Sequence, residues 1–377
     1  MQAAFVAAGL LVLYVALGQN AFHGLDAYHY LAFVDRGELH NAQSVLYQPV
    51  AWGFSRLGAS FGLPVYESMR LLSAIAATLG VVAVCRAARI LGLADRAWLV
   101  ALGCGLTPAV VHAATVLEVD AVLFGCACFA WLPFARLLRD NTVRAAIATG
   151  IATAVAAGFH AAGHLLAATL CCLQSAWGWP ARRLRRTVPC AVLLALTHAG
   201  AASSLLWFGG ARGQSTMATN TAALAFDAGM LPSILVHEWL LPHLPYCGLA
   251  LLASYRRDTR AAAIGLIACQ GGYLLVTTLV LGLFMATGPA LPHGAREFGS
   301  FLLGIVVPTV VLAVQAVPRR VAIAAVAVAA VAAVLQVRLR DWPADPEGYL
   351  AGWREATRGE VVAFLADDAQ EWNVGRR

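Results

Sequence analysis

The sequence contains no lysine, so all 26 of its basic residues are arginines. Charged residues of both signs make up only 12% of the chain, about half of what a soluble domain carries. The chain is also 60% hydrophobic, and a soluble protein of this composition would expose extensive apolar surface. An ordinary soluble domain is therefore excluded. The net charge of +6 does not indicate nucleic-acid binding, because the arginines are grouped in short loops.

The sequence also lacks a cysteine pattern typical of disulfides or zinc sites. Its nine cysteines lie within or at the ends of apolar segments, and their spacing fits no disulfide framework. The closest pairs, Cys126 with Cys128 and Cys171 with Cys172, have no further ligands at the spacing that zinc requires. We therefore interpret the cysteines as small residues that pack inside a membrane.

Apolar segments of about 17–25 residues dominate the sequence, and a helix of this length spans a bilayer. About eleven such segments predict an all-α polytopic membrane protein. No basic residues precede residues 3–18, so an uncleaved first helix is favoured over a removed signal peptide. The expected spans are residues 3–22, 67–85, 97–115, 119–138, 143–159, 161–178, 188–208, 233–254, 261–285, 299–317 and 321–337.

Groups of arginines occupy short loops that all fall on one side of the membrane when the spans are counted in order. The positive-inside rule makes that side cytoplasmic, which places the N terminus inside and the C terminus outside. The loops contain Arg86, Arg89 and Arg96; Arg136, Arg139 and Arg144; Arg182, Arg183, Arg185 and Arg186; Arg256, Arg257 and Arg260; and Arg319 and Arg320.

Longer connections with acidic residues and histidines lie on the outer side, at residues 23–66, 209–232 and 286–298. We expect any chemistry to take place there. Residues 1–338 then form one membrane domain, and residues 339–377 form a short polar, extracytoplasmic tail. Within this tail, Asp345 followed by Pro346 is a helix-start signal.

The first outer loop carries signals for two interfacial helices. A helix is expected over residues 25–36, ended by Gly37, and a second over about residues 48–58, begun by Pro49. The candidates for facing the membrane from the second helix are Trp52, Phe54 and Leu57.

Asp26 lies at the start of the first of these helices, where the first span meets the interface. Partial burial at such a place makes a carboxylate a better base. A solvated charge or a helix cap is the alternative interpretation.

Further ionisable residues lie at the outer ends of later spans. Glu118 and Asp120 lie at the start of the fourth span. They are either stabilised there by the helix dipole or in contact with a substrate. Arg296 either pairs with Glu297 at the surface or binds phosphate bidentately. Arg212 lies in a glycine-rich segment, either a flexible loop or a second phosphate-binding candidate.

Several histidines lie near the outer face. His160 and His164 are four residues apart and able to share a helix face, but no third zinc ligand accompanies them. His198 lies in mid-span and is expected to be packed or hydrogen-bonded.

The beginning of the chain resembles the GT-C membrane glycosyltransferases, in particular the group that includes bacterial lipid-A sugar transferases and relatives of protein O-mannosyltransferases. The resemblance covers about residues 1–140. Gln48-Pro49 departs from it, because Pro-Pro or His-Pro is common at that place. The matching positions are Asp26, Tyr30, Gly37, Leu46 to Pro49, Gly62, Glu67, Arg70 and Leu71, followed by Thr107-Pro108 and Glu118-Val119-Asp120.

The resemblance implies a GT-C-type fold with about eleven transmembrane helices and interfacial helices in the first outer loop. It also implies a hexosyltransferase of the bacterial inner membrane. Such an enzyme moves a sugar from a polyprenyl-phosphate donor to a hydroxyl of a lipid, glycan or protein at the outer leaflet.

The resemblance assigns roles to individual residues. Asp26 would be the general base, and Glu118 and Asp120 would contact the substrate. Arg296 and Arg212 would bind the donor phosphate. No cofactor is certain; Asp26, Glu118 and Asp120 are the candidate ligands for Mg²⁺ or Mn²⁺. Further substrate contacts are expected from Tyr30, His40, Gln48 and Arg70.

Two other classes of protein are alternatives. A secondary transporter or lipid flippase would place ionisable residues near the bilayer midplane and broken helices in repeated halves. Here the ionisable residues gather at one face, and no repeat is visible. A catalytically inactive membrane scaffold is the third class, and the presence of both Asp26 and Asp120 argues against it.

Overall fold

The computed structural model describes residues 2–18, 25–39, 45–117, 119–160, 162–177, 184–208, 236, 240–257, 259–287, 299–339, 348 and 351. Within these ranges helices are the only regular secondary structure, which confirms the predicted all-α class. The α-helices are α1 (Gln2–Ala16), α2 (Leu25–Arg36), α3 (Tyr47–Ser60), α4 (Val65–Ile90), α5 (Ala97–Gly105), α6 (Pro108–Thr115), α7 (Asp120–Asp140), α8 (Val143–Phe159), α9 (Gly163–Trp177), α10 (Leu184–Phe208), α13 (Tyr246–Leu252), α14 (Arg260–Thr287), α15 (Gly299–Ala316) and α16 (Arg319–Leu339).

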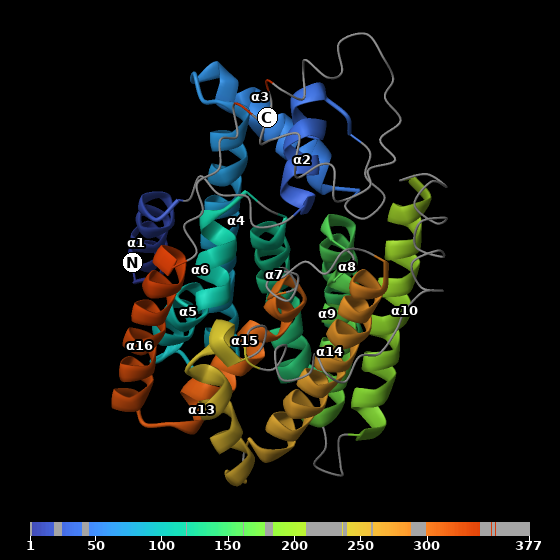
Figure 1. The fold of residues 1–377 in the computed structure, drawn as a ribbon. Coiled ribbons are helices and arrows are strands. Elements are labelled where there is room, and N and C mark those ends of the chain that lie inside the picture. Colours follow the sequence, from blue (N-terminus) through green and yellow to red (C-terminus); the bar gives the residue numbers. More distant parts are fainter. Residues whose placement is uncertain are drawn as a thin grey trace.

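The long helices stand side by side in a bundle, and α2 and α3 lie across one end of it (Figure 1). We call α2, α3 and residues 65–72 of α4 the cap. Helices α4 and α7 both start at the cap end and pack against each other. Their backbones approach closely where Gly80 meets Gly125, because a Cβ on Gly80 would lie 2.9 Å from the Gly125 Cα. Small residues allow such close packing between membrane helices.

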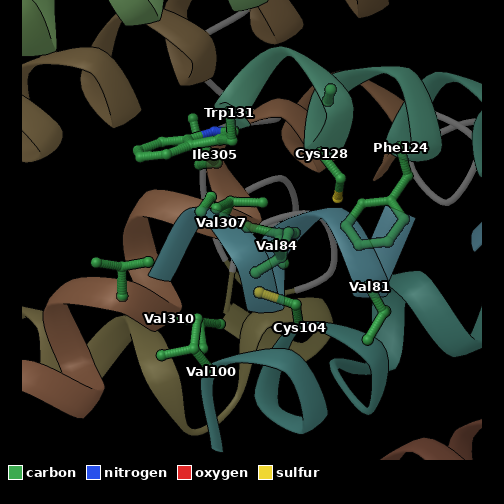
Figure 2. Close-up of a cluster of buried hydrophobic side chains, with 14 of the residues drawn as sticks. Val81, Val84, Val100, Cys104, Phe124, Cys128, Trp131, Ile305, Val307 and Val310 are labelled. Atoms are coloured by element: carbon green, nitrogen blue, oxygen red, sulfur yellow. The ribbon is translucent and has the colours of Figure 1, made fainter. Parts of the chain in front are cut away.

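The main apolar core lies where α4, α5, α7 and α15 meet (Figure 2). Trp131 and Phe134 of α7 are fully buried, and their rings make an edge contact with centroids 5.0 Å apart. Ile305 and Val310 of α15 belong to the same cluster. The core therefore holds α15, which is distant in sequence, against the central pair α4 and α7.

Within the described residues, four helical segments are long and apolar enough to cross a membrane, and the bent pair α5 and α6 adds a fifth. Shorter apolar helices occupy most of the other predicted spans, so the count of about eleven stays a prediction. The four segments are Val65–Ile90, Asp120–Asp140, Thr187–Leu205 and Arg319–Val337.

The span predicted over residues 97–115 is broken into α5 and α6, which meet at an angle of 59°. Pro108 begins α6, and a proline disfavours helical geometry in the residue before it, so Thr107 is extended with ψ 130°. The Tyr14 hydroxyl donates to the Gly105 carbonyl at 2.7 Å, and the Thr107 hydroxyl donates to the Gly103 carbonyl at 2.7 Å. Carbonyl groups near the break are thus hydrogen-bonded within the protein, as a bilayer requires.

The span predicted over residues 233–254 is not a continuous helix in its described part. Residues 240–255 contain a short 3₁₀ helix (Leu241–His243), then α13, then a second 3₁₀ helix (Ala253–Tyr255). Pro242 and Pro245 explain the interruption, because proline cannot donate the backbone hydrogen bond that a helix needs.

Two arginines hold the end of α15 that lies opposite the cap. Arg96, between α4 and α5, donates to the carbonyl oxygens of Val314 and Val317 at 3.0 and 2.9 Å. Arg256 donates to two further carbonyls of the same helix end, at 3.1 and 3.4 Å. The last carbonyls of a helix lack partners within the helix and favour positive charge. These loop arginines therefore stabilise the fold, in addition to any role in topology.

Replacing Arg96 by alanine is expected to lower the free energy of unfolding by about 1.5–3 kcal/mol, the range for hydrogen bonds to a charged group. Its ion pair with the exposed Asp95 adds little. Denaturant unfolding of the purified protein in micelles measures the change. Arg86→Ala, at an exposed position on α4, is the matched control and should shift stability by less than about 0.5 kcal/mol. Equal effects of the two changes would refute this role of Arg96.

Candidate functional site

The cap contains its own apolar cluster, built from α2, α3, the start of α4 and the junction of α6 and α7. Helices are present at both predicted places: α2 ends at Arg36 before Gly37, whose φ is +74°, and α3 spans Tyr47–Ser60. Only a residue that tolerates positive φ ends a helix in this way, which is why the glycine marked the boundary. The buried cluster consists of Ala27, Tyr30, Leu31, Val34, Tyr47, Ala51, Tyr66, Met69, Leu72, Leu117, Val119 and Val122.

The membrane-facing residues predicted on α3 are only partly correct. Leu57 is exposed, whereas Trp52 and Phe54 are partly buried against the cap cluster. The guanidinium of Arg56 lies 5.4 Å from the centre of the Trp52 ring, a cation–π contact. Helix α3 packs against α4, and Ala51 is buried on α3. Trp52 is the next residue, so its side chain is partly buried as well.

Asp26 lies in the first turn of α2, and its side chain is outside the described residues. The helical register places position 26 on the same side of α2 as Tyr30, four residues later. Tyr30 is buried, and its ring makes an edge contact with Tyr47 of α3, with centroids 4.8 Å apart. Position 26 is therefore one turn of α2 away from this contact between α2 and α3.

Gln48, in the first turn of α3, is completely buried. Neither its Nε2 nor its Oε1 has a hydrogen-bond partner within the described part of the chain. The Leu46 backbone N–H donates to the Gly158 carbonyl at 2.9 Å, which fixes this turn of α3 against the end of α8. A buried amide without partners costs about 1–3 kcal/mol, so its retention calls for an explanation. A ligand that offers both a hydrogen-bond donor and an acceptor would explain it, because it would satisfy both ends of the Gln48 amide.

Arg70 lies on α4, between Met69 and Leu72 of the cap cluster. Its guanidinium forms an ion pair with the Glu67 carboxylate at 2.5 Å. Its guanidinium packs over the backbone of Gly18, where a Cβ would collide with it. The side chains of Arg70 and Glu67 are 20% and 35% exposed, respectively. The structure thus places Arg70 at the junction of the cap with the end of α1, with its charge balanced by Glu67.

Asp120 is the first residue of α7 and is partly exposed. Its neighbours Val119 and Val122 belong to the cap cluster, so the start of α7 lies against the cap. Negative charge at this position is favoured by the helix dipole. Tyr30, Gln48, Arg70 and Asp120 are therefore all placed at the cap end of the bundle.

The remaining predicted site residues lie outside the described residues: Glu118, His40, Arg212 and Arg296. So does most of the polar tail, including Asp345 and Pro346. Among the residues that the structure describes, no group of three or more histidines, cysteines or carboxylates could hold a metal ion. The proposed Mg²⁺ or Mn²⁺ ligands Asp26 and Glu118 have no described side chains.

The histidines pair differently from the expected arrangement. His160 follows the end of α8 and accepts from the Ala162 backbone N–H at 3.2 Å, so it does not share a helix face with His164 of α9. His164 instead contacts His198 of α10, with Nδ1 and Nε2 2.9 Å apart. His198 is hydrogen-bonded in mid-span, as predicted. Periodicity could not reveal the pair, because its members lie 34 residues apart on different helices.

The fold is shared with solved glycosyltransferase structures. An oligosaccharyltransferase from Archaeoglobus fulgidus, solved with Zn and sulfate, aligns with 98% of this chain and 56% of its own, at 11% identity and a TM-score of 0.56. A mutant of the arabinofuranosyltransferase AftD from Mycobacteria aligns with 94% of this chain and 30% of its own, at 20% identity and a TM-score of 0.50. This chain thus spans about half of one protein and less than a third of the other.

These similarities show that the chain has the GT-C fold, as its sequence predicts. No family model matches the sequence, and no curated protein matches it in sequence.

Proposed function

We propose that this protein is a membrane glycosyltransferase whose substrates bind at the cap. The observation that carries this proposal is the buried, unpartnered amide of Gln48 beside the α2–α3 seam, in a chain with the GT-C fold. An amide offers both donors and an acceptor, and sugar hydroxyls can both accept and donate hydrogen bonds. The aromatic rings of Tyr30 and Tyr47 add apolar surface suited to the carbon face of a sugar ring.

In the proposed reaction, a polyprenyl-phosphate sugar is the donor and a lipid, glycan or protein hydroxyl is the acceptor. The acceptor oxygen attacks the anomeric carbon while the Asp26 carboxylate takes its proton. The bond from the anomeric carbon to the phosphate oxygen breaks, and polyprenyl phosphate leaves with the electron pair. Arg296 and Arg212 are the proposed partners of that phosphate, because a guanidinium binds two of its oxygens at once.

The other site residues are assigned to substrate binding. Glu118 and Asp120 would contact the sugar or the acceptor, with Mg²⁺ or Mn²⁺ between carboxylates as the alternative use. Arg70, held by Glu67, would present a fixed guanidinium at the cap. His40 is proposed as a further contact. The apolar helices support a multi-pass membrane protein, and we assign it to the bacterial inner membrane with the cap outside.

The break between α5 and α6 is a feature that resembles a transporter. Discontinuous helices in transporters expose backbone groups to a substrate or an ion. Here the Gly103 and Gly105 carbonyls near the break already accept hydrogen bonds from Thr107 and Tyr14. The break therefore favours a structural role over an ion site.

A donor panel tests the proposed function. Purified protein in nanodiscs is incubated with polyprenyl-phosphate sugars that differ in the sugar, and released polyprenyl phosphate is measured by mass spectrometry. We expect release of polyprenyl phosphate from one donor, and no release of polyprenyl pyrophosphate from the corresponding polyprenyl pyrophosphate sugars. Release from none of the polyprenyl-phosphate sugars, with a range of lipid and glycan acceptors present, would argue for the inactive scaffold.

A further inference from the structure

A chain of three polar side chains links α8, α9 and α10 inside the bundle. His164 Nδ1 lies 2.9 Å from His198 Nε2, and His198 Nδ1 lies 3.0 Å from the Thr153 hydroxyl oxygen. The Thr153 hydroxyl also donates to the Gly150 carbonyl at 2.9 Å. Thr153 is completely buried and His198 is 8% exposed, whereas His164 is only partly buried.

We assign the protons from the hydrogen bond that the Thr153 hydroxyl donates to the Gly150 carbonyl. A hydroxyl has one proton, and Thr153 gives it to a carbonyl that can only accept, so the Thr153 oxygen must accept from His198 Nδ1. A neutral imidazole carries one N–H, so His198 Nε2 is an acceptor and His164 Nδ1 donates to it. The lone pair of neutral His164 is therefore on Nε2.

This arrangement directs an incoming hydrogen bond to His164. Within the residues that the structure describes, the hydrogen bond of the His164 ring is made by Nδ1, and none is made by Nε2. A proton added at His164 Nε2 leaves every bond of the chain intact, whereas a proton added at His198 Nε2 would break the bond from His164. Thr153 and His198 thus fix the tautomer and the orientation of the His164 ring through hydrogen bonds.

His164 also lies at the same end of the bundle as the cap. It is the second residue of α9, and α9 follows the turn after Phe159, which packs against the cap cluster. We propose that His164 Nε2 accepts a hydrogen bond from a hydroxyl of the sugar substrate, with His198 and Thr153 as positioning residues. This proposal rests on the glycosyltransferase function inferred above.

Diethyl pyrocarbonate tests the proposal, because it acylates an accessible, unprotonated imidazole nitrogen. The full chain in nanodiscs is treated with the reagent, and acylated histidines are identified by mass spectrometry. We expect acylation of His164. Octyl mannoside should slow this acylation about fivefold, because one neutral hydrogen bond from a sugar hydroxyl to His164 Nε2 contributes about 1 kcal/mol. Octyl phosphate, which has the same alkyl chain and no sugar hydroxyls, should not protect. Equal protection by both probes, or by neither, would overturn the sugar site.

Variants of Thr153 test the positioning chain. Thr153→Val removes the acceptor for His198 Nδ1, so ¹⁵N NMR of labelled histidines should show His198 and His164 leaving the Nδ1–H form. Thr153→Ser should restore that form. Thr149→Val is the matched control, because Thr149 is equally buried on α8 and donates only to the Ala145 carbonyl at 2.7 Å. An unchanged spectrum in Thr153→Val would refute the assigned proton positions. The acylation and the ¹⁵N spectrum are both measured without sugar transfer. If both give the expected results and no transfer is detected, the proposed function fails while the hydrogen-bonded positions of Thr153, His198 and His164 stand.

Discussion

Replacing Asp26 by asparagine is expected to abolish sugar transfer while leaving the helical fold intact. Asparagine has nearly the same shape but cannot take a proton from the acceptor hydroxyl. Loss of a positioned base lowers the rate by about 10²–10⁴-fold. Turnover of the accepted donor measures the effect, and circular dichroism with thermal unfolding checks the fold.

Asp35 supplies the control for this change. It lies on α2, the same helix as Asp26, and is partly exposed near the opposite end of that helix. Asp35→Asn removes the same charge and should keep most of the activity. Full activity in Asp26→Asn would contradict the mechanism, and equal losses in both variants would show that the effect is one of general charge.

The second large effect is expected at Gln48, where stability and activity should move in opposite directions. Gln48→Met removes two buried polar atoms that have no partner in the described part of the chain, and it fills a similar volume. The free energy of unfolding should rise by about 1–3 kcal/mol. Transfer should fall about tenfold to a hundredfold in kcat/KM, because the sugar loses one or two hydrogen bonds.

Gln174 is the matched control for Gln48. It is also buried and its Oε1 likewise has no partner in the described residues, but its Nε2 donates to the Asn141 side-chain oxygen at 2.9 Å. Gln174→Met loses that hydrogen bond, so it should stabilise the protein less than Gln48→Met does. A stabilised and fully active Gln48→Met protein would remove Gln48 from the site, and a destabilised one would mean that its amide is bonded in the free protein.

Local signals in the sequence were sufficient for the two helices of the cap. Gly37 marks the end of α2 because its positive φ excludes most other residues, and Pro49 marks the first turn of α3. The break after α5 was missed, although Pro108 signals it. Hydropathy alone treats residues 97–115 as one apolar run, and the hydrogen bond from Tyr14 that satisfies the break comes from a distant helix.

The candidate site was only partly accessible to sequence reasoning. The resemblance to GT-C glycosyltransferases indicated Gln48, but its complete burial depends on how α3 packs against α4 and the end of α8. Trp52 turns inward for the same reason. The contact between His164 and His198 depends on the packing of α9 against α10, and no local pattern encodes it.

A structure of the protein with its sugar donor bound would test the proposed mechanism most directly. We expect the sugar to lie at the cap, with a hydroxyl within about 2.6–3.2 Å of the Gln48 amide and the anomeric carbon facing Asp26. Arg296 or Arg212 should contact the donor phosphate. A donor bound at the opposite end of the bundle, or at the cap with its anomeric carbon away from Asp26, would contradict the proposed mechanism.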